Sequence, residues 1–149
     1  MTLDVREPSR QSSTAVLARV FREPFLHWLE VAEKRVPHVE FRVTETLRSR
    51  ERQAWLYAQG REEPFLHAPR ATWTMESRHR WGLAADLAMI RKSTGQAIWE
   101  IPSWRWLYEY VPLEPFGLRH IAPLEWVHVE LARADEVIKH AGLLGLEQV

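Results

Sequence analysis

Residues 77–86, Ser-Arg-His-Arg-Trp-Gly-Leu-Ala-Ala-Asp, and residues 125–130, Glu-Trp-Val-His-Val-Glu, decide which fold and which chemistry this chain can have. Together they offer two imidazoles and one carboxylate as ligands on one side of a metal ion, from His79, His128 and Asp86. A catalytic zinc site needs three protein ligands and one open position for water, whose pKa the metal lowers to about 7. A second carboxylate, Glu125, precedes His128 by three residues. The two stretches therefore predict a catalytic zinc site with a free carboxylate beside it.

The second stretch has the alternating pattern of a strand with one buried face. Because successive side chains of a strand point to opposite faces, one face carries Val127, Val129 and Leu131, and the other carries Trp126, His128 and Glu130. Glu125 has the wrong parity to share the second face on a regular strand. We therefore expect it at the start of the strand, where the backbone after Pro123 can turn its carboxylate inward.

The composition limits the chain to a small domain without thiol chemistry. With 149 residues and 46% hydrophobic content, it fits a single domain, residues 1–149, whose core needs no disulfides. The absence of cysteine excludes thiolate metal sites and cysteine nucleophiles. Lys plus Arg equal Asp plus Glu at 20 each, so no global charge attracts nucleic acid or a membrane. Residues 42–92 are mildly basic, with ten Lys and Arg against six Asp and Glu, which suits an anionic substrate.

The first eight residues, Met-Thr-Leu-Asp-Val-Arg-Glu-Pro, lack the basic start and apolar run of a secretory signal. No stretch of the sequence reaches the length and hydrophobicity of a membrane-spanning helix. We therefore expect a protein that is cytoplasmic on synthesis and does not insert into a membrane.

The periodicity and the turn residues predict a mixed α+β fold. Helices are expected over residues 13–22, 24–36, 49–60, 102–110 and 132–141, and strands over 41–44, 83–89, 116–120 and 126–131. Pro24 suits the first turn of its helix, and Ser49 suits an N-cap. Residues 61–78 show no period and form a long loop, a feature that is often functional in a compact domain. Without a regular βαβ rhythm, the pattern favours a mainly antiparallel sheet flanked by helices.

The ordered set of motifs resembles the zinc peptidoglycan peptidases. The motifs are Arg48-Ser49 at a strand-to-helix turn, then Ser77-x-His79-x-x-Gly82-x-Ala84-x-Asp86, then Glu125-x-x-His128-x-Glu130. This group includes the D-Ala-D-Ala carboxypeptidases and the phage L-alanyl-D-glutamate endopeptidases (endolysins), and it shares the hedgehog/DD-peptidase fold. The similarity spans residues 24–135, and residues 44–49 with Gln53 and Gly60-Arg61 also match the opening strand and helix of the family. The resemblance implies that residues 1–149 are one zinc peptidase domain.

Roles carry over from this family residue by residue. The resemblance makes Zn²⁺ the cofactor and assigns its ligands to His79, Asp86 and His128. Glu125 becomes the general base, which takes a proton from the attacking water and delivers it to the leaving amine. Arg48 becomes the group that stabilises the oxyanion.

Further residues near these motifs are assigned less directly. Ser77 is expected to hold the loop around His79 or to touch substrate. Glu130 shares the parity of His128 and could accept a hydrogen bond from the second nitrogen of a ligand. Three tryptophans close to the site in sequence either line a groove or pack in the core: Trp73, Trp81 and Trp126. Two departures from the family, Leu47 for an aromatic residue and Trp81 for a smaller polar one, concern the shape of the substrate.

Three classes of function compete. The first is a zinc peptidase acting on the peptidoglycan stem peptide, as a monomer that reaches the cell wall after release or export by another route. Within it, an L-alanyl-D-glutamate endopeptidase fits the short chain and basic middle better than a D-Ala-D-Ala carboxypeptidase. The second class is a non-catalytic, hedgehog-like metal-binding module, against which the presence of Glu125 and Arg48 argues. The third is a structural domain in which these residues coincide by chance.

Overall fold

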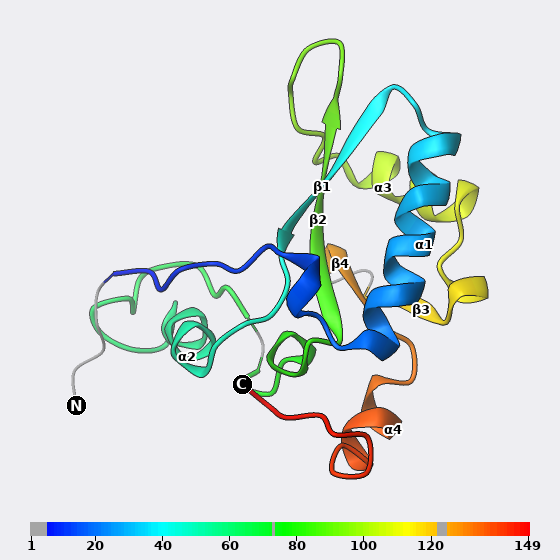
Figure 1. The fold of residues 1–149 in the computed structure, drawn as a ribbon. Helices are drawn as coiled ribbons and strands as arrows, with labels where there is room; N and C mark the ends of the chain where they lie inside the picture. Colours follow the sequence, from blue (N-terminus) through cyan, green and yellow to red (C-terminus); the bar gives the residue numbers. More distant parts are fainter. Residues whose placement is uncertain (1–5, 73, 122–124) are drawn as a thin grey trace.

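The computed structural model describes residues 6–72, 74–121 and 125–149. In these ranges the strands form one antiparallel sheet of four with the order β1-β2-β4-β3 (Figure 1). Their bounds are Val39–Glu45 (β1), Ala84–Arg91 (β2), Leu118–Ile121 (β3) and Glu125–Leu131 (β4). The two long central strands, β2 and β4, therefore lie inside the sheet, where neighbouring strands fix their register.

Helices and short 3₁₀ turns connect the strands. The helices are Arg19–Arg35 (α1), Arg50–Ala58 (α2), Ile101–Tyr110 (α3) and Ala134–Lys139 (α4). The 3₁₀ turns are Thr14–Val16 (η1), Arg78–Trp81 (η2) and Glu114–Phe116 (η3). This arrangement confirms the predicted α+β class with an antiparallel sheet. None of the helices in the described ranges is long and apolar enough to cross a lipid bilayer.

The core lies between one face of the sheet and the helices α1 and α3, which Figure 1 shows on the same side of the strands. Trp28 of α1 and Leu107 of α3 are fully buried there, against Leu87 of β2 and Val129 of β4. Burial of such large apolar side chains supplies the main driving force for folding. The opposite face of β2 and β4 is thereby left free for polar side chains.

The two helices predicted over 13–22 and 24–36 were wrong in their boundaries. Residues 14–16 form only the 3₁₀ turn η1, and a single helix α1 runs from Arg19 to Arg35 with Pro24 inside it. Proline removes one helical hydrogen bond and so favours a helix start over a helix interior. Here Phe21 and Phe25, on either side of Pro24, are both fully buried and stack with ring centroids 5.1 Å apart. Core packing on both sides of the proline keeps the helix continuous.

The other predicted elements are present with shifted ends. Ser49 caps α2 as expected, since its side chain accepts a hydrogen bond from the backbone N–H of Arg52. The segment 61–77 contains no helix or strand among its described residues, in agreement with the predicted loop. Helix α4 is shorter than the predicted 132–141, because β4 continues to Leu131 and a turn precedes the helix.

Gly82 forms the turn that joins η2 to β2. Its φ is +70°, in the left-handed region that favours glycine, and its backbone N–H bonds to the carbonyl oxygens of Arg78 and His79. The chain of residues 17–18 passes close by: Ala18 donates its N–H to the Gly82 carbonyl at 3.1 Å. A Cβ added at Gly82 would lie 2.9 Å from the nitrogen of Ala18. Both the conformation and the space at this turn require glycine.

We predict that Gly82→Ala destabilises the metal-free protein more than Gly117→Ala does. Gly117 has nearly the same φ, +74°, but nothing lies within 4 Å of an added Cβ, so it carries only the conformational penalty. That penalty is about 1–2 kcal/mol, and Gly82→Ala adds the clash with Ala18. Urea unfolding in the presence of a chelator measures both changes. Equal losses of stability in the two variants would contradict the close approach of Ala18.

Candidate metal centre

The register of the sheet places the first two candidate ligands side by side. Asp86 of β2 lies directly opposite His128 of β4, so both side chains project from the face of the sheet that the helices leave free. The neighbours of Asp86, Ala85 and Leu87, are buried on the other face. The same alternation that fills the core therefore sets the position of the site.

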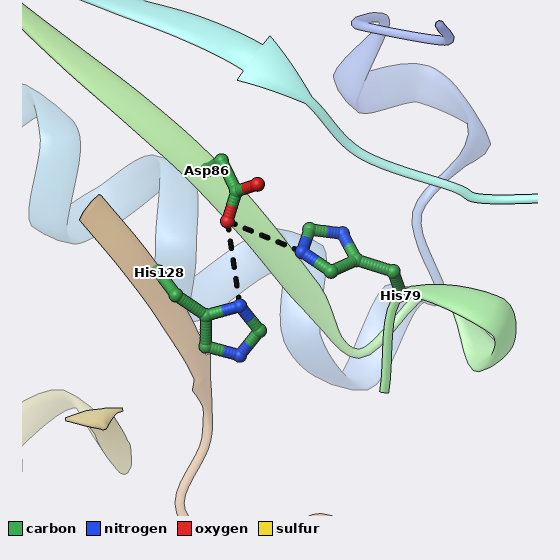
Figure 2. Close-up of side chains that lie close together, drawn as sticks. All are labelled: His79, Asp86 and His128. Carbon is green, nitrogen blue, oxygen red and sulfur yellow. Dashed lines mark hydrogen bonds and ion pairs between the residues drawn. The ribbon is translucent and has the colours of Figure 1, made fainter. Parts of the chain in front are cut away.

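The third candidate ligand, His79, comes from the turn η2 that precedes β2. Ser77 caps this turn, and its Oγ accepts a hydrogen bond from the His79 backbone N–H at 3.2 Å. The ring Nδ1 donates to the carbonyl oxygen of Thr46 at 2.7 Å. This bond fixes the tautomer and leaves Nε2 directed at Asp86, with 3.2 Å between Nε2 and Oδ1 (Figure 2).

His128 is oriented in the same way by a carboxylate. Its Nε2 donates to Oε1 of Glu130 at 2.8 Å, and its Nδ1 lies 3.3 Å from the same oxygen of Asp86 that faces His79 (Figure 2). Glu130 is itself held by Arg119, whose Nη2 is 2.7 Å from Oε2. A carboxylate behind a ligating histidine fixes its ring and raises its basicity. Glu130 thus occupies the supporting position that the parity of β4 suggested.

The surroundings of Asp86 and of His128 shift the pKa of each side chain. Burial alone would raise the pKa of Asp86, but the two imidazoles beside it hold that pKa well below its usual range. Burial would lower the pKa of His128, yet hydrogen bonds to Asp86 and Glu130 outweigh it and raise the pKa to about 9. Without a metal the site is therefore an imidazolium held between two carboxylates, and a cation can take the place of the proton.

The donor set fits a zinc ion. One ligand atom from each of His79, Asp86 and His128 lies within 4.8 Å of the others. Two zinc bonds of about 2.0–2.1 Å at a tetrahedral angle separate their donor atoms by about 3.3–3.4 Å. The separations of Asp86 Oδ1 from the two ring nitrogens, 3.2 and 3.3 Å, match this value. Two imidazole nitrogens and one carboxylate oxygen are also the ligand types of catalytic zinc sites.

The predicted general base and oxyanion-stabilising residue both lie beside these ligands. Glu125 is the first residue of β4, and its Oε2 is 3.6 Å from Nδ1 of His128. The β3–β4 pairing is irregular between His120 and Ile121, and Ile121 pairs with Glu125. Arg48 is buried, with Nη2 3.7 Å from Oδ2 of Asp86. Pro123, expected to turn the chain before Glu125, lies outside the described residues.

These groups line a cavity of about 350 Å³. Besides the three candidate ligands, Glu125 and Arg48, its walls include Ser77, Arg78, Glu130 and, from the loop after α2, Thr72 and Thr74. The cavity is large enough to admit a short stretch of peptide chain at the ligands.

Sequence reasoning missed an ion-pair network in the wall of this cavity. Glu45 accepts hydrogen bonds from Arg48, at 2.8 Å to Nη2, and from Nε of Arg52. Arg52 also binds Glu7 at 2.8 Å, and Arg48 binds Gln53 at 3.0 Å. Burial would raise the pKa of Glu45, but the two guanidinium groups lower it instead. The close spacing of Glu45, Arg48 and Arg52 along the chain was the signal that could have indicated this network.

Of the tryptophans named as groove candidates, the two that the structure describes, Trp81 and Trp126, do not line the cavity. Trp81 packs against the core and is absent from the cavity lining. Trp126 also packs against the core; it stacks on His120 with ring centroids 5.2 Å apart, and the Arg105 guanidinium lies 5.7 Å from its ring. The alternation predicted Trp126 on the same face as His128, but its side chain packs against the core instead. Trp73 lies outside the described residues.

Comparison with known proteins gives a structural match without a sequence match. No family model matches the chain, and no curated protein sequence matches it. The fold is similar to that of the L-Ala D-Glu endopeptidase ChiX from Serratia marcescens, with a TM-score of 0.53 and 19% identity over 91% of this chain and 98% of that one. The LD-carboxypeptidase LdcB gives a TM-score of 0.48 and 17% identity over 84% of this chain and 71% of that one. The match to ChiX confirms the fold that the motifs implied.

We predict that single substitutions at the ligands abolish tight zinc binding without unfolding the protein. His79→Ala and His128→Ala each remove one of three donors, whereas His140→Ala removes an exposed imidazole far along the chain and serves as the control. Atomic emission after dialysis should find about one zinc per chain in the parent and the control, and close to none in the two ligand variants. One zinc per chain in either ligand variant would contradict the assignment.

Zinc affinity should rise with pH up to about 9 and level off above it. The reason is the raised pKa of His128, about 9, because a protonated ring must lose its proton before Nδ1 can bind metal. At pH 7 each zinc bound therefore displaces the proton of the His128 ring. Competition with a chromogenic chelator measures the affinity, and calorimetry in two buffers of different ionisation enthalpy measures the proton. An affinity that does not change between pH 7 and 9 would contradict the raised pKa.

Proposed function

We propose that this chain is a zinc-dependent peptidase that cleaves the peptidoglycan stem peptide at the L-alanyl-D-glutamate bond. The observation that carries the proposal is a partly exposed carboxylate, Glu125, that lies beside a set of three side chains able to hold a metal ion in a cavity. The structural similarity to an L-Ala D-Glu endopeptidase supports the choice of reaction. We further propose that the protein acts as a monomer on the cell wall, which it reaches after release or export.

His79, Asp86 and His128 would hold the zinc ion. When bound, zinc acts as a Lewis acid on a carbonyl group and makes water a nucleophile at neutral pH. The chain contributes the positions of the groups around the metal. Thr46 and Glu130 hold the two imidazoles so that the ligating nitrogens face inward.

Glu125 is suited to move the proton. Its side chain is 37% exposed, so its carboxylate can reach both the ligands and a substrate in the cavity. As a general base it accepts a proton from the attacking water, and as a general acid it passes this proton to the nitrogen of the departing amine. The same carboxylate thereby serves both halves of the hydrolysis.

Arg48 is suited to stabilise the negative charge that develops on the carbonyl oxygen. Its guanidinium is held by Glu45 and Gln53 and faces the oxygen of Asp86 that the imidazoles leave free. A fixed, permanently charged donor needs no reorganisation during the reaction. A module that only binds metal needs neither this arginine nor Glu125, which argues against a non-catalytic role.

Mass spectrometry of fragments released from purified peptidoglycan tests the choice of bond. An L-alanyl-D-glutamate endopeptidase creates new glutamyl amino termini, whereas a carboxypeptidase releases only terminal alanine. Intact cell walls after prolonged incubation with zinc-loaded protein would overturn the proposed function.

We predict that Glu125→Ala retains zinc and lowers the rate of hydrolysis at least a hundredfold, because the base is removed and the ligands remain. Glu136→Ala, the same change at an exposed position of α4, should leave the rate unchanged. Release of soluble fragments from cell walls measures the rate, and metal analysis checks the loading. Normal digestion by Glu125→Ala would show that another group acts as the base.

Arg48→Ala should also retain zinc while kcat falls by about two to three orders of magnitude, as for the loss of an oxyanion-stabilising donor. Because this change leaves Glu45 with a single arginine partner, the folded state is checked by thermal unfolding with and without zinc. Unchanged kcat in a folded, zinc-loaded Arg48→Ala protein would remove Arg48 from the mechanism.

A further inference from the structure

A second cavity adjoins the metal centre along the edge strand β3. It measures about 340 Å³ and is lined by Arg78, Arg119, His120, Ile121 and Glu130. Three of these residues, Arg78, Ile121 and Glu130, also line the cavity that holds the candidate ligands. A molecule that occupies the metal centre can therefore extend into this second cavity.

Two arginines contribute to the lining of the second cavity. Among the described residues that line it, the charged groups are the guanidinium groups of Arg78 and Arg119 and the carboxylate of Glu130. Two nitrogens of Arg119 contact the same oxygen of Glu130, Nε at 2.9 Å and Nη2 at 2.7 Å. A guanidinium has five N–H donors, so further donors remain on Arg119.

Arg78 has donor capacity that the fold does not use. Its Nη2 pairs with Asp135 of α4, whose side chain is 73% exposed, and its Nε is buried without a hydrogen-bond partner in the described structure. A buried donor without a partner carries an energetic penalty, so the fold does not fully satisfy the Arg78 guanidinium. An exposed ion pair contributes little, so Asp135 is a weak competitor for the guanidinium.

We propose that the second cavity binds a carboxylate of the substrate next to the bond that is cut, and that Arg78 determines this specificity. This inference rests on the proposed function. A glutamyl residue uses its amine and one carboxyl group to continue a peptide chain, so its other carboxylate stays free. Arginine presents a planar pair of donors that matches a carboxylate. Arg78 directly precedes the candidate ligand His79 in η2, so the anion-binding group and a metal-binding group share one turn.

Arg119 is a poor residue for the test, because it holds Glu130 and thereby the ring of His128. Its substitution would disturb the metal ligands as well as the second cavity. Among the described residues, Arg78 has no side-chain contact with a candidate metal ligand. Substitution of its partner Asp135 should strengthen the binding of an anion, whereas substitution of Arg78 should weaken it. These two positions separate anion binding from metal binding.

The test compares two peptides, L-alanyl-D-glutamyl-L-lysine with a free glutamyl carboxylate and the same peptide with that group as an amide. Dissociation constants are measured by calorimetry on zinc-loaded Glu125→Ala protein, which binds without cleaving. We expect the carboxylate peptide to bind about tenfold more tightly than the amide. In the same background, Arg78→Gln should bring this ratio close to one, and Asp135→Asn should increase it. Arg42→Gln, an exposed arginine paired with Glu40 on β1, is the control and should leave the ratio unchanged.

Equal affinity for the two peptides, or the same ratio before and after Arg78→Gln, would overturn the inference. Hydrolysis of both peptides and of cell walls by the parent protein is measured separately. Cleavage combined with an unchanged ratio in Arg78→Gln means that the proposed function holds and the carboxylate subsite does not. Absence of cleavage combined with a preference that depends on Arg78 means that the carboxylate subsite holds and the proposed function does not.

Discussion

A single oxygen of Asp86 lies within 3.3 Å of a nitrogen from each of two imidazoles, and the rest of the site is arranged around this contact. Placing an anion on a largely buried sheet face is costly unless charged or hydrogen-bonding partners surround it. Asp86 has His79 and His128 on one oxygen and Arg48 near the other. The contact depends on register, since a slip of one residue in β2 would turn Asp86 into the core and Leu87 outward. Core packing and site geometry are therefore fixed by the same strand pairing.

Much of this could be predicted from the sequence because the decisive signals are local. Alternation in residues 126–131 gives β4, and Gly82 gives the turn that brings His79 back over β2. The predicted α+β class is confirmed, and the side chains expected at the metal, with Glu125, lie together. The supporting bond from His128 to Glu130 follows from their shared parity on one strand. The local structures that such short-range patterns predict depend little on distant parts of the chain.

The features that could not be predicted depend on contacts between distant segments or on a break in periodicity. Glu45 has the parity of Phe41 and Val43, which predicts a place toward the core. An irregularity between Val43 and Glu45 in the β1–β2 pairing instead sets Glu45 opposite Asp86, on the face of the site. Likewise, α1 continues through Pro24 because of core packing, which helix propensities along the sequence do not take into account.

The contacts of the acidic side chains in the cavity distinguish the candidate metal ligand from the other acids. Five acidic residues line the cavity in the described part of the chain: Glu45, Glu76, Asp86, Glu125 and Glu130. The oxygens of Glu45 are bound by two arginines, and those of Glu130 by His128 and Arg119, so neither competes for a metal. Glu76 is turned toward Gln148. Because these three acids are already paired, Asp86 is left as the candidate anionic ligand, and Glu125 lies beside it with a partly exposed carboxylate. A divalent cation held by two neutral imidazoles and one carboxylate would keep an overall charge of about +1, which preserves its Lewis acidity.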